Sequence, residues 1–351
     1  MKTRLLYSLF LFPLIIAFFI TQTAFSQSQL TFPQVSQKAS VLQRVGLTDI
    51  TIEYYRPGVK GREIWGKLVP YNKVWRAGAN ENTTISFSDP VKINGKYLPA
   101  GKYGLHMIPG ENEWTIIFSK NNWSWGSYFY DKNEDALRVM VKPQISEFHE
   151  WLTFSMDNPS SNSVDVNLSW DKLKTGFNVS VGNEIVINHL KKELNNLQGF
   201  SWQAWNQAAN YAFQNNISLE EAVSWSDKSI RINKNGSNLW TKASLLEKTG
   251  NTSEADKLKS EALSIATENE MNMIGYQFVF NKQFDKAIEI FKKNVAQHPD
   301  SWNVYDSLGE AYAANGDKNL AIENYQKALN MVKDDNNKVR IHKIIDDLRS
   351  D

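Results

Sequence analysis

Apolar and polar residues alternate repeatedly between about residues 41 and 181, which predicts β-strands. Residues 50–54, 164–168 and 177–181 each place an apolar side chain at every second position. The Asn94-Gly95 pair predicts a tight hairpin, because both residues accept the positive φ of a two-residue turn. No helical segment separates the strands, so an antiparallel β-sandwich or barrel-like domain is expected. Further strands are predicted at 103–108, 113–119, 137–141 and 151–156.

The hydrophobic pattern becomes helical after about residue 183, where Pro299 is the only proline. The segment aligns with itself at a spacing of about 34 residues, which relates Gly275 to Gly309 and Ala287 to Ala321. This pattern resembles the tetratricopeptide repeat, in which small residues stand where paired helices touch. We therefore predict about four helical hairpins between 200 and 349. The large side chains that we assign to their core are Phe278, Phe291, Tyr312 and Tyr325.

The N-terminus has the features of a secretory signal peptide. Lys2 and Arg4 precede an apolar run, and small residues follow it, so cleavage is expected after Ser26. The alternative is an uncleaved anchor, but the run is shorter than the ~20 residues of a spanning helix. The expected location is periplasmic or secreted, with no stable membrane span after cleavage. The expected domains are 1–26 signal peptide, 27–182 β-domain, 183–199 linking helix and 200–351 tetratricopeptide-like repeats.

Composition excludes several classes of function. The chain has no cysteine, which rules out disulfides, thiol catalysis and thiolate metal sites. Its net charge of +1 gives no reason to expect a nucleic-acid partner. The five histidines lack the spacing of a metal site, and no nucleophile motif or phosphate-binding glycine loop occurs. We expect neither a metal nor a cofactor.

The densest group of polar and aromatic residues lies between residues 54 and 87. Arginine forks bind carboxylate or phosphate, and tryptophan faces support sugars or cations. We interpret this group as a binding site for an anionic or sugar-bearing ligand. The predicted ligand-binding residues are Arg56, Lys60, Arg62, Trp65, Trp75, Arg76, Asn80 and Glu81.

Two alternatives compete with this interpretation. In the first, the protein is a glycan-acting hydrolase or lyase in which Glu81 is the acid or base, and Glu53, Glu63 or Tyr55 assists it. In the second, the arginines are structural and pair with Glu53, Glu63 and Glu81 to hold long loops.

An aromatic run at 123–130, WSWGSYFY, admits two interpretations. Exposed, it would form a carbohydrate platform or a docking surface. We favour the other interpretation, in which it caps one end of the sandwich or packs against the repeats, because aromatic rings are more often buried.

The first domain resembles bacterial domain-of-unknown-function family 2911 over roughly residues 32–180. The segments that carry the resemblance are YRP at 55–57, VKGR at 59–62, IWG at 64–66, LVPY at 68–71, VWR at 74–76, GANE at 78–81, PAGKY at 99–103 and WTIIF at 114–118. The resemblance implies a Bacteroidetes-like envelope protein, and a helical repeat tail is familiar in this group. It implies no activity. We therefore expect a non-catalytic module whose β-domain binds the small ligand and whose repeats bind a protein partner.

Overall fold

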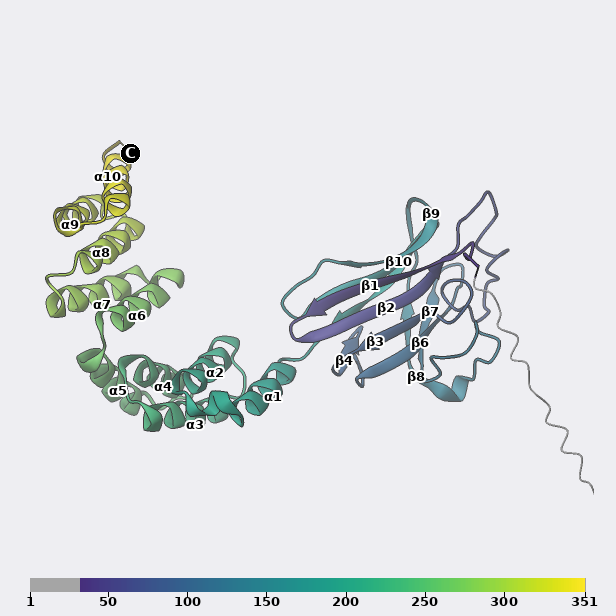
Figure 1. The fold of residues 1–351 in the computed structure, drawn as a ribbon, viewed down its shortest axis with the longest axis horizontal. Coiled ribbons are helices and arrows are strands. Elements are labelled where there is room, and N and C mark those ends of the chain that lie inside the picture. The colour runs from purple at the N-terminus through teal and green to yellow at the C-terminus, as the bar shows by residue number, and fades with distance from the viewer. Residues whose placement is uncertain (1–31, 351) are drawn as a thin grey trace, which may run out of the picture.

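The computed structural model describes residues 32–350, and the predicted signal peptide lies outside them (Figure 1). Two antiparallel sheets form the N-terminal domain, which confirms the predicted sandwich. The first sheet has the order β1-β2-β3-β6-β7-β8, and the second has the order β5-β4-β10-β9. The strands are β1 Gln37–Val45, β2 Thr48–Arg56, β3 Thr84–Phe87, β4 Val91–Ile93, β5 Lys96–Leu98, β6 Gly101–Ile108, β7 Trp114–Ser119, β8 Asp135–Val141, β9 Gln144–Asp157 and β10 Ser163–Ser180.

The period-two pattern builds the core between the sheets. In β2 every second residue from Thr48 to Tyr54 is buried, as the alternation predicts. The predicted hairpin joins β4 to β5, and its turn residues Asn94 and Gly95 have φ angles of 47° and 80°. Burial of these apolar faces is the main force that holds the two sheets together. The largest fully buried side chains of this core are Trp114, Trp170 and Phe118.

The long segment β10 folds back on itself at Asp171, whose φ is 55°. Its two halves lie side by side, because Val181 N donates to Asn162 O at 2.9 Å and Asn178 Nδ2 donates to Asp165 Oδ1 at 2.8 Å. Gly176 permits this close approach, since a Cβ added there would stand 2.2 Å from the carbonyl oxygen of Val166.

The C-terminal region consists of helices that form four hairpins in the described part of the chain, as the repeat pattern predicts. The hairpins are α2–α3, α4–α5, α6–α7 and α8–α9, and α10 packs on α9. The helices are α1 Asn183–Leu194, α2 Trp202–Asn215, α3 Leu219–Ile232, α4 Gly236–Lys248, α5 Thr252–Ile265, α6 Glu268–Phe280, α7 Phe284–Gln297, α8 Trp302–Asn315, α9 Lys318–Met331 and α10 Asp335–Ser350; short 3-10 turns lie at Lys132–Glu134 and Leu197–Phe200.

Small residues let the paired helices approach closely. A Cβ added to Gly275 in α6 would lie 2.4 Å from the ring of Phe291 in α7, so this ring packs directly on the glycine backbone. Ala287 in α7 and Ala321 in α9 are fully buried. Together these contacts explain the spacing of small residues that marks the repeats in the sequence.

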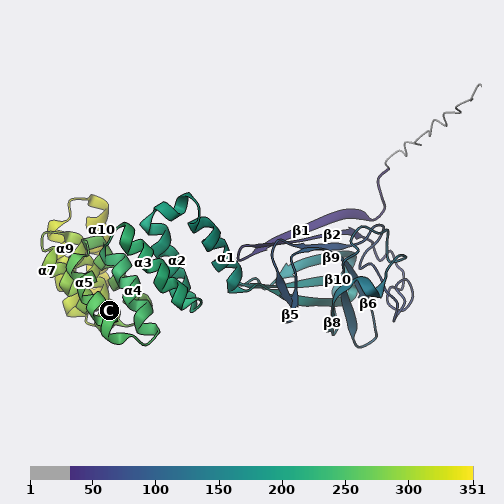
Figure 2. The same ribbon diagram turned by 90° about the horizontal axis from the view of Figure 1, so that it is seen from below.

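The two domains are joined through α1, and the helical hairpins curve away from the sheets (Figures 1 and 2). Among the described residues, no helix is long and apolar enough to span a lipid bilayer.

Candidate functional site

The predicted ligand-binding residues do not form one cluster, because Trp65 and Trp75 belong to the core. Their rings pack edge-to-face at 5.8 Å, and Trp65 contacts Trp114 at 4.8 Å. Trp75 stacks on Trp170 at 6.0 Å, and its Nε1 donates to Gly78 O at 3.1 Å. Their faces therefore contact other tryptophans, which is a structural role. A role for them as walls of a ligand site stays a prediction.

Two of the predicted arginines bind backbone carbonyl or hydroxyl oxygens rather than carboxylates. Arg56 at the end of β2 donates to Leu152 O at 3.0 Å and to Thr153 Oγ1 at 2.7 Å, so it ties one sheet to β9 in the other. Arg62 donates to Val59 O at 3.1 Å and to Gly58 O at 2.6 Å within its own loop. These bonds satisfy loop carbonyls, although not through the glutamates that the structural interpretation names.

The remaining polar residues of the group face solvent or hold neighbouring segments. Lys60 is exposed and has a positive φ of 50°. Asn80 donates to Gln34 Oε1 at 2.6 Å and to Ser36 O at 3.2 Å, so it fixes the segment that precedes β1. Glu81 is exposed, and its charge adds to burial in raising the pKa of Tyr55.

Arg76 differs from the other arginines because its Nε is buried without an acceptor and no carboxylate of the described chain forms an ion pair with it. Burial lowers its pKa, and the nearby Tyr128 and Glu81 partly oppose that shift. Its guanidinium carbon lies 6.0 Å from the ring centre of Trp125. A half-buried guanidinium with unused donors has the chemistry to pair with an anionic group.

The rings next to Arg76 form an exposed aromatic surface. Trp125 and Tyr128 are stacked at 5.6 Å with only 9° between their planes. They are 56% and 75% exposed, and Trp123 and Phe129 are also exposed. The expectation that the aromatic loop, residues 123–130, packs against the sandwich or the repeats is therefore wrong for these four rings. A flat pair of exposed rings beside a cation suits a sugar that carries an acid group.

Polar bonds from the sheet hold the aromatic loop in place. Asn82 is buried, and with its carboxamide oriented to satisfy its neighbours it donates to Ser124 O at 3.2 Å and to Gly126 O. His106 in β6 shares a 2.8 Å hydrogen bond with Ser127 Oγ. The exposed rings are thus attached to a loop that is fixed beneath them, which reduces the entropy cost of binding.

A second set of bonds fixes the end of this loop, and burial keeps His106 neutral at pH 7. Tyr130 donates to Asp135 Oδ2 at 2.8 Å, and Arg138 bonds both groups. Burial lowers the pKa of His106 to about 4, and the Asp135 carboxylate only partly offsets that effect. The described residues contain no group of three or more side chains suited to hold a metal ion.

Glu53 is a poor proton donor. Lys102 and Lys38 each bond its carboxylate at 2.8 Å, and these bonds lower its pKa to about 2. It is therefore ionised at neutral pH, which does not fit a general acid beside Glu81.

Sequence reasoning included Arg76 but omitted Trp125 and Tyr128 from the site. The aromatic run itself was the signal. The sequence could not place this run, which follows β7, beside Arg76, which precedes β3, because that contact depends on how the sheet is assembled.

Comparisons with known proteins agree with this architecture. Residues 36–179 match the family described as "Protein of unknown function (DUF2911)", and residues 303–334 match a tetratricopeptide repeat. No curated protein matches the chain.

Solved structures are similar to the helical region. MamA from Desulfovibrio magneticus RS-1 is 20% identical over 42% of this chain and 84% of its own, with a TM-score of 0.28. YrrB, described as a tetratricopeptide repeat protein with an unusual peptide-binding site, is 20% identical over 46% and 83%, with a TM-score of 0.27. PilF of Pseudomonas aeruginosa is 17% identical over 43% and 68%, with a TM-score of 0.28. The β-domain of this chain thus matches the DUF2911 family, and its helical region contains a match to a tetratricopeptide repeat.

Proposed function

We propose that this protein is an exported, non-catalytic adaptor. Its β-domain binds an anionic, sugar-bearing ligand, and its repeats bind a protein partner. The observation that supports the ligand site is Arg76, a half-buried cation without an ion-pair partner in the described chain, next to the stacked rings of Trp125 and Tyr128. A carboxylate on the ligand would take the free guanidinium donors, and its sugar ring would lie against the aromatic faces.

The proposed roles of the other predicted residues differ from that of Arg76. Arg56 and Arg62 act through the backbone carbonyls that they bind, and so they support the loops around the site. Glu81 is exposed near Arg76 and lowers the net positive charge there. This arrangement favours ligands with one acid group over highly charged polyanions.

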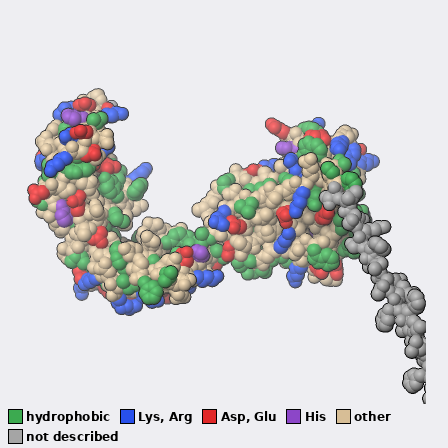
Figure 3. All heavy atoms as spheres, in the orientation of Figure 1, with side chains coloured by type: hydrophobic (Ala, Val, Ile, Leu, Met, Phe, Trp, Pro, Cys, Tyr) green, Lys and Arg blue, Asp and Glu red, His purple; other side chains and the backbone are tan. Residues whose placement is uncertain are grey.

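The protein partner would bind at a groove of about 810 Å³ where the α4–α5 and α6–α7 hairpins meet. Trp240 and Phe278 pack edge-to-face at 6.0 Å, and Leu263 and Ile290 extend the apolar lining. Figure 3 shows hydrophobic side chains beside Lys and Arg on the visible face of the helical region. The apolar side chains lie among three lysines and three acidic residues, which are Lys259, Lys286, Lys293, Glu247, Asp256 and Glu289. A groove of this mixed kind suits a peptide segment with apolar anchors and charges of both signs.

A titration of uronic acids and sugar phosphates tests the ligand site. Glucuronate should bind the chain from Gln27, and Arg76→Ala should weaken binding roughly tenfold to hundredfold, because hydrogen bonds to charged groups contribute ~1.5–3 kcal/mol. Arg44→Ala is the matched control, since Arg44 pairs on the surface with Asp49 at 2.7 Å. Equal binding by wild type and Arg76→Ala would contradict the proposal.

Photocrosslinking tests the repeat groove separately. A crosslinking residue at Gln277, which lines the groove, should capture a partner that the same residue at exposed Lys343 on α10 does not. The partner should be released by Trp240→Ala. Capture from both positions, or no effect of Trp240→Ala, would place docking elsewhere.

A glycan-acting hydrolase or lyase that uses Glu81 stays an alternative prediction. It requires that a labelled glycan be cleaved by wild type and not by Glu81→Gln.

A further inference from the structure

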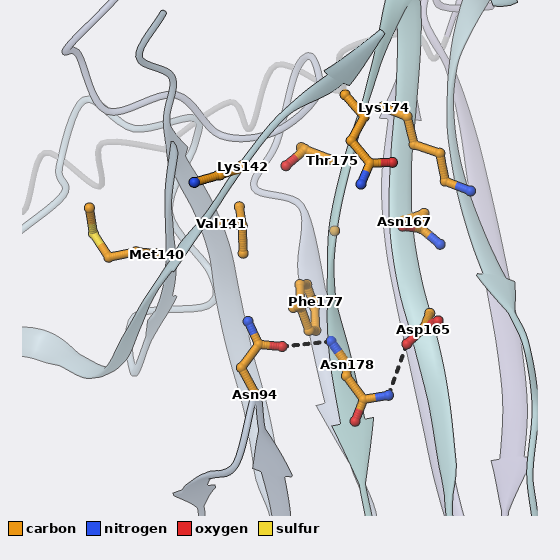
Figure 4. Close-up of a pocket in the computed structure, with 12 residues that line it drawn as sticks. Asn94, Met140, Val141, Lys142, Asp165, Asn167, Lys174, Thr175, Phe177 and Asn178 are labelled. Carbon is orange, nitrogen blue, oxygen red and sulfur yellow. Dashed lines mark hydrogen bonds between the residues drawn. The ribbon is translucent and has the colours of Figure 1, made fainter. Parts of the chain in front are cut away.

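A polar cleft of about 340 Å³ lies between β10 of the second sheet and the end of β8 in the first sheet (Figure 4). Residues of β10, the Asn94 turn and the stretch 140–144 line it. Figure 4 shows Asn167 and Asn178 on one side of the cleft and Lys142 on the other. The site is separate from Arg76, which does not line it.

Three asparagines of the cleft use only half of their carboxamide within the described protein. Asn94 Oδ1 accepts from Asn178 N at 2.8 Å, which leaves its Nδ2 unused. Asn178 Nδ2 donates to Asp165 at 2.8 Å, and Asn167 Nδ2 donates to Asp157 at 2.9 Å, which leaves both Oδ1 atoms unused. The internal bonds fix each amide, and the unused donor and acceptors lie around one cleft.

Gly176 and Thr175 add to this construction. Gly176 lines the cleft beside Asn167, and a Cβ added there would stand 2.4 Å from Asn167 Oδ1, so the glycine lets this amide lie against the backbone of β10. The Oγ1 of Thr175 is buried and has no hydrogen-bond partner in the described protein, and Figure 4 shows it pointing from β10 toward β8. Buried hydroxyls almost always have a partner, so this unpartnered hydroxyl is a second observation that points to a ligand in the cleft.

The charges of the cleft are fixed near neutral pH. Lys174 Nζ bonds Asp157 Oδ2 at 3.0 Å, and this bond is the main cause of the lowered pKa of Asp157. Asp165 also has a lowered pKa, because Asn178 and Asn158 donate to it. Lys142 is exposed and forms no ion pair with a described carboxylate. One free cation therefore faces a set of neutral amides.

We infer that this cleft binds a sugar ring. Hydroxyl groups both donate and accept hydrogen bonds, and they are the groups that match a free amide N–H beside two free amide oxygens. Lys142 then bonds a ring hydroxyl or a carboxylate at the rim. This gives the β-domain a second ligand site, and it does not depend on the Arg76 site.

Saturation-transfer NMR on the chain from Gln27 tests the inference, with the neutral sugars glucose and N-acetylglucosamine as probes, because glucuronate is the ligand expected at Arg76. Wild type should transfer saturation to at least one sugar. In the double variant Asn94→Gly, Lys142→Ala, the saturation-transfer signal of the sugar should fall at least tenfold. Glycine keeps the positive φ of the turn but removes the free amide. Lys92→Ala, at an exposed position of β4, should retain the signal.

A readout without a variant covers the case in which the double variant does not fold. With ¹⁵N-glycine labelling, sugar should shift the amide resonance of Gly176 in the wild type and leave that of Gly126, near Arg76, unchanged. Three outcomes would overturn the inference: no transfer to any of the sugars, transfer that survives in a folded double variant, or a shift confined to Gly126.

Discussion

Acidification should destabilise the β-domain through one buried histidine. His106 is 2% exposed, and burial lowers its pKa from about 6.5 to about 4. Between these two values the unfolded chain binds a proton that the folded chain does not, so stability falls as the pH falls through this window. The difference between the two pKa values corresponds to roughly 3 kcal/mol of the free energy of unfolding. About 2 kcal/mol of this stabilisation is already lost at pH 5.

The carboxylates act in a different range, which separates their effect. Paired lysines lower the pKa of Glu53 to about 2, and Asp157 and Asp165 are also lowered. The stabilisation from these carboxylates is complete above their pKa values in the unfolded chain, which are near 4. It is lost only as the pH falls below those values. A decline in stability between pH 6.5 and 5 therefore reports His106 in this domain.

The assay is urea unfolding at pH 7.5, 6 and 5, followed by pulsed hydrogen exchange and mass spectrometry of peptides from β6 and β7. His106→Asn is the matched variant, because its amide can replace Nδ1 as the partner of Ser127 and does not titrate. Between pH 7.5 and 5 the free energy of unfolding of the wild type should fall by about 2 kcal/mol more than that of the variant. Parallel losses in the two proteins, or no loss in wild type, would refute this reasoning.

Three further predictions concern the fold and the loops. Gly275→Ala should destabilise the helical region by ~1–3 kcal/mol in urea unfolding, because its Cβ would meet Phe291; an unchanged midpoint would contradict that packing. Asn82→Ala should speed amide hydrogen exchange in the aromatic loop, because Asn82 bonds two carbonyls of that loop. An exchange rate equal to that of the wild type would show that other bonds hold the loop. Arg62→Ala should lower the melting temperature of the β-domain but leave glucuronate affinity unchanged, since its donors bind loop carbonyls; a loss of affinity would place Arg62 in the site.

Local patterns predicted the elements well. The Asn94-Gly95 turn, the alternating strands and the spacing of small residues from Gly275 to Gly309 each depend on residues near one another in sequence, and each is present in the structure. Strand β1 begins earlier than the hydrophobic alternation, because its first residues are polar and lie at the edge of the sheet.

The site was harder to predict because it depends on contacts between distant segments. Arg76 meets Trp125 only after its neighbour Trp75 has paired with Met107 in β6 and after β6 has paired with β7, which precedes the aromatic loop. Trp65 and Trp75 look like ligand walls in sequence, yet they pack on Trp170 from the opposite sheet. The amide cleft was missed altogether, since β10 must reverse at Asp171 before its asparagines face one cleft.

The central claim is that Arg76 is a ligand receptor and not a structural cation. Isothermal titration of glucuronate into wild type, Arg76→Ala and Arg44→Ala tests it most directly. The account predicts binding by wild type and Arg44→Ala and a loss of roughly tenfold or more in Arg76→Ala, with all three proteins equally stable. Unchanged affinity in a folded Arg76→Ala protein would contradict it.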